Sequence, residues 1–234
     1  MRLRDPNLIS HRYRCIFIHI PRTAGTSVES ALGHFEGEVR RGDQDHRSIR
    51  IIRRPLLNPA ILSSVENLAE ALRSVRYRFR SYSNPNNAIT VTSRQYREYY
   101  KFTVVRDPWN RVYSAYRNLT TDEFHRRNLG ITGKPSLRSF LRRFAGRDML
   151  RPQTYWISDF DGRIPLDYII RFEDLESGFR EVAATLGDET LSLPYQNKGG
   201  SGNYRDRYDD ETAAMVREYY REEIEIFGYS FQSP

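Results

Sequence analysis

The chain has 234 residues, of which 29% are charged, 13% are aromatic and one is cysteine, and its formal net charge is +7. This length suits one α/β domain with a sizeable core, and the composition excludes a disordered chain. A single cysteine excludes a disulfide within the chain. The positive charge favours an anionic partner such as a nucleotide, an acidic glycan, a nucleic acid or an anionic lipid surface.

The first predicted elements are a strand, a loop and a helix between residues 15 and 32. The apolar run Cys15–Ile20 is too short for a typical helix, and Cys15 is expected to be buried at its start. The loop that follows combines small and hydroxylic residues with one cation, in the order Pro21-Arg22-Thr23-Ala24-Gly25-Thr26-Ser27. Backbone N–H groups in such a loop, together with a helix N-terminus, favour a phosphate-like anion. An ordinary strand-to-helix turn is the alternative.

A helix with one apolar face is predicted over about residues 64–80. Ser63 and Glu66 match a capping box at its start. The apolar residues of the predicted face recur at helical spacing: Leu68, Leu72, Val75 and Phe79. Such a stripe is typical of a core-facing helix, so we expect it to be buried. A turn at residues 84–87 follows the helix.

A second strand–loop–helix unit follows the same design. The strand is predicted at Lys101–Val105, which places Arg106 at its carboxyl end. Asp107 is a plausible N-cap and Pro108 suits the first helical turn, so Ser114 lies two turns into the helix. Ligands of open α/β sheets bind outside the carboxyl ends of the strands. Two such units predict one ligand with two separated anionic groups.

The last predicted helix begins near Asp209 and ends at Gly228. Its inner face is expected to comprise Val216, Tyr219, Tyr220, Ile224 and Phe227. A glycine-rich basic loop, residues 198–205, precedes this helix and is either a segment that closes over a ligand or an ordinary surface loop.

The two motifs resemble those of a known family. Ile18–Ser27 resembles the 5′-phosphosulfate loop of sulfotransferases that use 3′-phosphoadenosine 5′-phosphosulfate (PAPS), and Val104–Tyr116 resembles their 3′-phosphate motif. Gln153, the segment Ile170–Leu175 with Phe179, and the tail Phe227–Phe231 extend the similarity, which spans roughly residues 15–231. The carbohydrate sulfotransferase branch (sulfotransferase family 2), with its soluble bacterial members, is the most similar. The chain departs from the pattern at Arg22, where the family usually has Lys, and over residues 51–100, which match poorly.

The resemblance implies a three-layer α/β fold, with a mainly parallel sheet, helices on both faces and a topology like that of P-loop kinases. It implies one sulfotransferase domain over residues 1–234. The expected reaction is O-sulfation without a metal: an acceptor hydroxyl, on a glycan or glycolipid, attacks the sulfur of PAPS and adenosine 3′,5′-bisphosphate leaves. In-line transfer of this kind depends on positioning and charge stabilisation.

The resemblance also assigns site residues. Arg22 is expected to stabilise charge on the bridging oxygen, and Arg106 and Ser114 to hold the 3′-phosphate. The 5′-phosphate would be held by the loop: Arg22, Thr23, Ala24, Gly25, Thr26 and Ser27. From the 198–205 loop, Lys198 or Arg205 would reach the 3′-phosphate and Tyr204 would flank the adenine. Helix capping by Thr26 or Ser27, and pairing of Arg106 with Asp107 or Glu173, are the structural alternatives.

His46 is the candidate general base, because a neutral imidazole accepts a proton well near neutral pH. It follows the first helix in the region where several family members place a catalytic His, and Asp45 is expected to orient it. A solvated loop histidine is the alternative reading, and a carboxylate base, beginning with Glu29, stays open.

Other functions are weighed by what the sequence lacks. Neither a Walker loop nor a Gly-x-Gly-x-x-Gly motif after a strand is present, and the histidines show no metal-ligand spacing. Two alternatives stay open: a basic protein that binds polyanions or nucleic acid, and a nucleotide-binding family member without turnover. For the sulfotransferase itself no nucleic-acid partner is expected. The N-terminal residues lack an apolar stretch of signal or membrane-spanning length. This favours a cytoplasmic enzyme, leaves peripheral membrane contact open, and allows the Golgi lumen only for a trimmed chain.

Overall fold

The computed structural model describes residues 9–35, 42–53, 58–194 and 203–231. These residues form two compact units, and the chain passes between them several times. The first unit contains residues 9–20, 24–35, 42–53, 58–105 and 155–194. The second contains residues 21–23, 106–154 and 203–231. The prediction of a single domain over residues 1–234 stays a prediction.

The first unit contains the sheet. Its strands are β1 (Ile9–Ser10), β2 (Cys15–Ile18), β3 (Tyr100–Val105) and β4 (Tyr168–Arg171), in the order β1-β2-β3-β4. Strand β1 is antiparallel to β2, whereas β2, β3 and β4 are parallel, with Phe17 opposite Phe102 and Val104 opposite Ile170. Both strands predicted from the apolar runs are therefore confirmed. Cys15 is fully buried, as expected.

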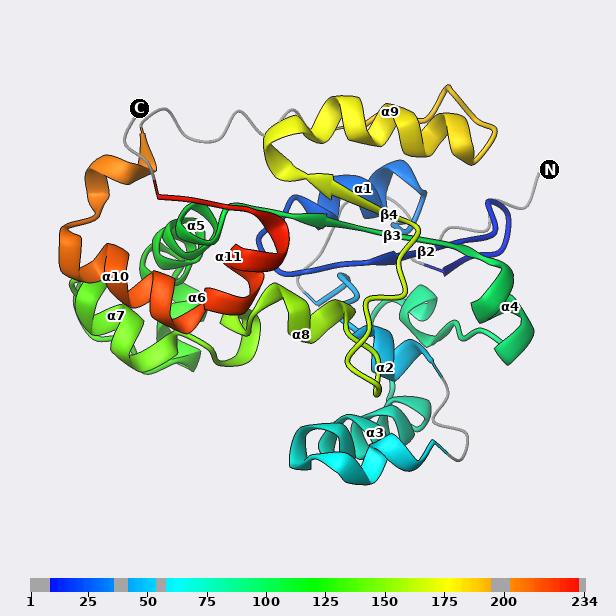
Figure 1. The fold of residues 1–234 in the computed structure, drawn as a ribbon, viewed down its shortest axis with the longest axis horizontal. Helices are drawn as coiled ribbons and strands as arrows, with labels where there is room; N and C mark the ends of the chain where they lie inside the picture. Colours follow the sequence, from blue (N-terminus) through cyan, green and yellow to red (C-terminus); the bar gives the residue numbers. More distant parts are fainter. Residues whose placement is uncertain (1–8, 36–41, 54–57, 195–202, 232–234) are drawn as a thin grey trace. The chain divides into compact units, whose positions relative to one another are not determined.

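Helices cover both faces of this sheet (Figure 1). The unit's helices are α1 (Gly25–Ala31), α2 (Ile49–Ile52), α3 (Val65–Arg78), α4 (Ser93–Glu98) and α9 (Leu175–Thr185), with 3-10 turns η1 (Pro59–Ser63), η2 (Pro85–Ala88) and η4 (Phe172–Asp174). Helices α1 and α9 pack Val28, Phe179 and Val182 against one face of the sheet, and α2 and α3 lie on the opposite side. This mainly parallel α/β arrangement confirms the predicted fold class.

The second unit is helical. It comprises α5 (Pro108–Thr121), α6 (Glu123–Asn128), α7 (Leu137–Phe144), α10 (Asp210–Tyr219) and α11 (Arg221–Phe227), with 3-10 turns η3 (Asp148–Leu150) and η5 (Tyr204–Arg207). Helix α8 (Gln153–Ile157) begins in this unit and ends in the first. The core of the second unit packs Trp109 and Val112 of α5 against Phe140 of α7 and Val216 of α10.

Two local predictions are confirmed at the helix ends. The Asp107 side chain caps α5 by accepting a hydrogen bond from the Asn110 N–H, and Pro108 is the first helical residue. Gly228 ends α11 in the left-handed conformation, at φ 63°. Both signals act within a few residues, which is why the sequence alone carries them.

Three expectations about helices were wrong. The N-cap of α3 is Ser64, which accepts from the Asn67 N–H, whereas Ser63 ends η1. The apolar stripe of α3 is exposed, because the buried side of the helix carries Asn67, Glu70 and Ser74. The C-terminal helix is two helices that meet at Tyr220, and the change of direction leaves Tyr219 44% exposed instead of on the inner face.

Candidate active site

The loop after β2 has an unusual backbone. Arg22 and Ala24 both adopt positive φ, 71° and 65°, a region that side-chain-bearing residues seldom occupy. Two arginines of the second motif bind this loop within the second unit. Arg111 Nε donates to the carbonyl of Pro21 at 3.0 Å, and Arg106 Nη1 donates to the carbonyl of Arg22 at 3.1 Å. Strained backbone of this kind persists where neighbouring groups hold it, and it is concentrated at functional sites.

The side chain of Arg22 points to Ser114 on α5. Its Nη2 donates to the Ser114 hydroxyl at 2.9 Å, and its Nε lies 3.3 Å from the same oxygen. Burial lowers the pKa of Arg22, although a guanidinium keeps its charge at neutral pH. Arg106 donates Nη2 to Asn110 Oδ1 at 2.9 Å. The three candidate residues Arg22, Arg106 and Ser114 are therefore brought together in one unit.

The rest of the loop, Ala24 to Ser27, opens α1 in the first unit. Ala24 is the N-cap, and no side chain in the described chain caps this helix, so Thr26 and Ser27 are not capping residues. The Ser27 N–H donates to the Ala24 carbonyl at 3.0 Å and is thus engaged within the turn. Thr23, Gly25 and Ser27 are buried, whereas Thr26 is half-buried.

Gly25 lies directly against the imidazole of His19. A Cβ at position 25 would fall 1.9 Å from Cδ2 of that ring, so no other residue fits without movement. His19 is itself buried, and its Nδ1 lies 2.9 Å from Oε1 of Glu29. This explains physically why the loop has glycine at this position: the histidine occupies the space of a side chain.

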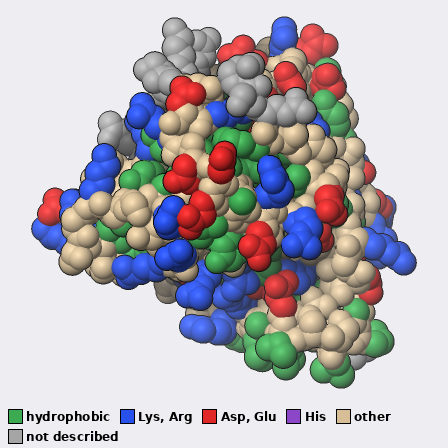
Figure 2. All heavy atoms as spheres, turned by 60° about the vertical axis from the view of Figure 1, so that its left-hand side comes forward, with side chains coloured by type: hydrophobic (Ala, Val, Ile, Leu, Met, Phe, Trp, Pro, Cys, Tyr) green, Lys and Arg blue, Asp and Glu red, His purple; other side chains and the backbone are tan. Residues whose placement is uncertain are grey.

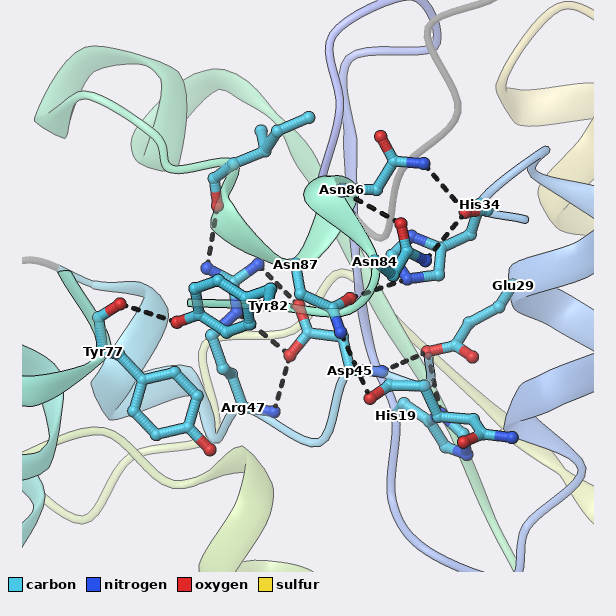
Figure 3. Close-up of polar contacts among 12 residues, drawn as sticks. His19, Glu29, His34, Asp45, Arg47, Tyr77, Tyr82, Asn84, Asn86 and Asn87 are labelled. Carbon is cyan, nitrogen blue, oxygen red and sulfur yellow. Dashed lines mark hydrogen bonds and ion pairs between the residues drawn. The ribbon is translucent and has the colours of Figure 1, made fainter. Parts of the chain in front are cut away.

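Glu29 on α1 connects this histidine to the segment that carries His46 (Figure 3). The Asp45 N–H donates to Glu29 Oε1 at 3.0 Å, and the second carboxyl oxygen, Oε2, has no hydrogen-bond partner in the described chain. Glu29 is fully buried, and burial raises the pKa of its carboxyl to about 8, against the opposing effects of His34 and the Asp45 N–H. A residue so enclosed cannot touch an acceptor hydroxyl in this conformation.

His46 keeps an exposed surface, and its ring lies 4.2 Å from that of His19. Its Nδ1 is 3.3 Å from the His19 carbonyl, which can only accept, so Nδ1 carries the hydrogen and Nε2 presents a lone pair. Desolvation by the surrounding atoms, followed by the charge of His19, lowers the pKa of His46 to about 4.

Asp45 does not orient His46, contrary to the sequence-based expectation. Its carboxylate instead accepts from the Arg47 N–H at 3.1 Å and from Arg47 Nε at 2.7 Å. Arg47 in turn donates to the Ile89 carbonyl, and Asn84 and Asn87 each donate to the Asp43 carbonyl at 3.2 Å. The segment with His46 is therefore fixed by the turn at residues 84–89, as Figure 3 shows.

The glycine-rich loop belongs to the described residues from residue 203 onward. Lys198 lies outside the described residues. The Tyr204 hydroxyl donates to Asp107 Oδ2 at 2.9 Å, and the guanidinium of Arg205 lies over the Tyr204 ring, 4.9 Å from its centre. Both residues therefore lie beside the cap of α5, in the same unit as Arg106 and Ser114.

Sequence reasoning assigned no contacts to three buried polar residues around the second motif. Arg111 is 1% exposed and, besides Pro21, its Nη2 donates to the carbonyls of Met149 and Arg151. The Gln153 side chain accepts from the Arg106 backbone N–H and donates to the Arg106 carbonyl. Its backbone N–H and its side-chain Nε2 both donate to Glu223. Burial raises the pKa of Glu223 to about 7. Both Gln153 and Arg111 lie in segments that the family resemblance covers, but the partners join distant parts of the chain and give no local signal.

No helix among the described residues is long and apolar enough to cross a membrane. Within the same residues, no group of three or more His, Cys, Asp or Glu side chains could hold a metal ion.

Comparison with known proteins identifies the family. A sequence model of the sulfotransferase family matches residues 5–230, nearly the whole chain. The searches of curated proteins and of solved structures returned no significant match. The chain therefore belongs to the sulfotransferase family, whose members transfer sulfuryl groups.

Proposed function

We propose that this chain uses PAPS as sulfuryl donor and sulfates a hydroxyl of a carbohydrate, on a glycan or glycolipid. The support is the family membership together with two motifs in the order that PAPS-dependent enzymes have them. The contacts among Arg22, Arg106 and Ser114 carry most weight, because the two motifs lie far apart in sequence.

The residues present fit a ligand with two phosphate groups. Arg22 and Arg106 supply two guanidinium groups, which bind phosphate in a bidentate manner, and Ser114 supplies a hydroxyl beside them. In the proposal Arg106 and Ser114 hold the 3′-phosphate, with Lys198 or Arg205 and Tyr204 as further contacts. The loop Arg22, Thr23, Ala24, Gly25, Thr26 and Ser27 holds the 5′-phosphate. The donor itself supplies an activated sulfuryl group.

Arg22 has the proposed electrostatic role. When the bond between sulfur and the bridging oxygen breaks, negative charge grows on that oxygen, and a nearby cation lowers the barrier. To do so Arg22 has to exchange its contact with the Ser114 hydroxyl for one with the leaving phosphate. Arg22 supplies the positive charge of the usual lysine, but carries it on a planar guanidinium group.

His46 is the proposed base. Its Nε2 lone pair and exposed surface suit removal of the proton from an acceptor hydroxyl while the oxygen forms its bond to sulfur. Glu29 is the carboxylate that the sequence left as an alternative base. It is buried and hydrogen-bonded to His19, so its proposed influence on the reaction is indirect, through His19.

The proposal is tested by incubating the purified protein with radiolabelled PAPS and a panel of hydroxyl acceptors. Label should pass to a carbohydrate acceptor without added metal. Arg22→Ala should lower turnover by about 10²-fold or more, the usual effect of removing one transition-state charge donor. His46→Ala should lower it by about 10²–10⁴-fold. Transfer that survives both substitutions unchanged would reject these assignments, and nucleotide binding without transfer to any acceptor would identify a member without turnover.

A further inference from the structure

Helix α3 and the end of η1 expose six large hydrophobic side chains, which we call the α3 apolar face: Leu62, Val65, Leu68, Leu72, Val75 and Phe79. Their exposed fractions run from 43% to 86%. From Val65 onward the spacing alternates between three and four residues, which places them in one row along the helix. Figure 2 shows hydrophobic side chains gathered along the lower edge of the view, the height at which α3 lies in Figure 1. Exposed apolar patches mark binding surfaces or aggregation liabilities.

The opposite side of α3 is polar and buried, which fixes how the helix is turned. Glu70 accepts hydrogen bonds from the Ser48 hydroxyl, from the Tyr155 hydroxyl and from Arg73. Asn67 accepts from Arg50 at 2.9 Å and donates to the Phe160 carbonyl at 2.9 Å. Rotating α3 to bury its apolar side would leave these polar groups without partners, at a cost of about 1–3 kcal/mol for each buried group. The apolar face is therefore held outward.

The charges on α3 are unevenly distributed. Its two carboxylates are engaged within the unit: Glu66 pairs with Arg50 at 2.7 Å and Glu70 is buried. The sequence from residue 71 to residue 80 contains no acidic residue and four arginines. All four are exposed, but Arg73 pairs with Glu70 at 3.0 Å, so the positive charge beside the face comes from Arg76, Arg78 and Arg80. The carboxyl-terminal half of the apolar face is thus flanked by positive charge.

We propose that the α3 apolar face docks onto an anionic membrane surface, with the helix lying flat in the headgroup region. An amphipathic helix with Leu and Phe on one side and arginines beside them has the composition of such interfacial helices. Apolar side chains enter the boundary of the acyl chains while arginines bind anionic headgroups. The surface includes none of the candidate active-site residues, so this inference does not depend on the proposed function.

The charges favour a membrane over a second copy of the chain. In a symmetric dimer through α3, the arginine-rich end of one helix would need a carboxylate from the other. The two that α3 has, Glu66 and Glu70, are already paired within their own unit. Burying the arginines against one another would be unfavourable, whereas an anionic lipid surface supplies the missing negative charge.

The test is co-sedimentation of the full chain with vesicles of phosphatidylcholine alone and of phosphatidylcholine mixed with phosphatidylglycerol. Binding should be strong only to the mixed vesicles and should weaken with salt. The double variant Leu72→Ser/Phe79→Ser should bind at least about tenfold more weakly, because burial of even one such side chain is worth about a factor of ten. Arg76→Glu/Arg80→Glu should lose the preference for anionic vesicles. All four side chains are exposed, so folding should be unaffected, which melting curves check.

Ile226→Ser and Arg97→Glu, at exposed positions on α11 and α4, are the controls for loss of an exposed apolar side chain and for reversal of an exposed positive charge, and they should bind like the wild type. The proposal is overturned if the wild type ignores anionic vesicles, or if the α3 variants bind as well as the controls. It is equally overturned if light scattering finds a dimer in solution that Leu72→Ser/Phe79→Ser dissociates, since a second copy would then cover the face.

Discussion

At the scale of single residues, Gly25 joins the loop after β2 to His19, whose ring lies against that of His46. Because a Cβ at position 25 would overlap the imidazole, Gly25→Ala must displace either the ring or the loop. We expect a loss of unfolding free energy of about 1–3 kcal/mol, as for other overpacked sites, and a fall in turnover. Chemical denaturation and the sulfation assay measure the two effects.

The control is the double variant. In a His19→Ala background the ring is absent, so adding Gly25→Ala should lower the free energy of unfolding much less than it does in the wild type. If Gly25→Ala lowered the free energy of unfolding equally in both backgrounds, the backbone of the loop would require glycine independently of the His19 ring.

Glu29 predicts a characteristic pH dependence of stability. Its native pKa, about 8, lies above the ordinary value of 4.5, so the folded state binds a proton that the unfolded state has released. The stability from this group is therefore fully present below about pH 4.5 and is lost as the pH rises through 8. Glu29→Gln keeps an oxygen for the Asp45 N–H but does not titrate, and should flatten this decline.

The measurement is the free energy of unfolding at several pH values between about 5 and 9. Glu225→Gln, at an exposed carboxylate, is the control for loss of a charge. His46 acts in the opposite sense: its pKa is lowered, so its effect destabilises the fold as the pH drops from about 6.5 toward 4. A wild type and a Glu29→Gln variant with parallel profiles would contradict a protonated Glu29.

At the scale of elements, α5 holds the loop after β2 through Arg111. This guanidinium donates to carbonyls of Pro21, Met149 and Arg151, in an environment where burial lowers the pKa of the arginine. Arg111→Lys keeps the charge but cannot span three carbonyls, since an ammonium lacks the planar fork. We expect a loss of about 2–4 kcal/mol in stability and a clear loss of turnover.

Denaturation and the transfer assay test this together. Arg117→Lys, at an exposed position of the same helix, is the matched control and should change neither. Unchanged turnover in Arg111→Lys would mean that the loop keeps its conformation without this contact.

The elements show which features a sequence can predict. Strands β2 and β3, the Asp107 cap and the Gly228 end were predictable because each depends on neighbours within a few residues. For α3 the periodicity identified a helix with an apolar side but could not tell which side faces inward. That depends on Glu70 finding Ser48 and Tyr155, from distant parts of the chain.

The candidate site residues also divide into those that the sequence predicts and those that only the fold identifies. The loop, Arg106 and Ser114 were selected from motifs, whereas the contacts of Gln153, Glu223 and Arg111 are to partners that only the folded chain brings close. His46 was selected by position, but its contact with His19 was not foreseen, and the expected role of Asp45 was wrong because Arg47 takes its carboxylate.

At the scale of the whole molecule, the candidate residues are distributed over both units. Arg22, Arg106, Ser114 and Tyr204 belong to the second, whereas the residues from Ala24 to Ser27 and His46 belong to the first. Each unit has its own hydrophobic core. A net charge of +7 favours an anionic ligand in general, so the specific prediction has to distinguish nucleotide recognition from simple charge attraction.

Adenosine 3′,5′-bisphosphate should raise the melting temperature, since a ligand that binds only the folded state stabilises it. AMP lacks the 3′-phosphate and should stabilise the protein much less. Arg106→Ala should narrow the difference between the two nucleotides, because Arg106 is the proposed 3′-phosphate ligand. The quantity to compare is the ligand-induced shift, since Arg106→Ala also removes contacts to Arg22 and Asn110 and lowers the starting melting temperature.

Arg97→Ala, at an exposed arginine of α4, controls for loss of one positive charge and should leave the difference between the nucleotides unchanged. If simple charge attraction dominated, both arginine variants would reduce binding of both nucleotides to a similar extent, and added salt would abolish it. Equal stabilisation of the wild type by AMP and by adenosine 3′,5′-bisphosphate would remove the basis for assigning Arg106 and Ser114 to the 3′-phosphate. A difference that Arg106→Ala alone reduces would tie recognition of that phosphate to the residue that directly follows β3.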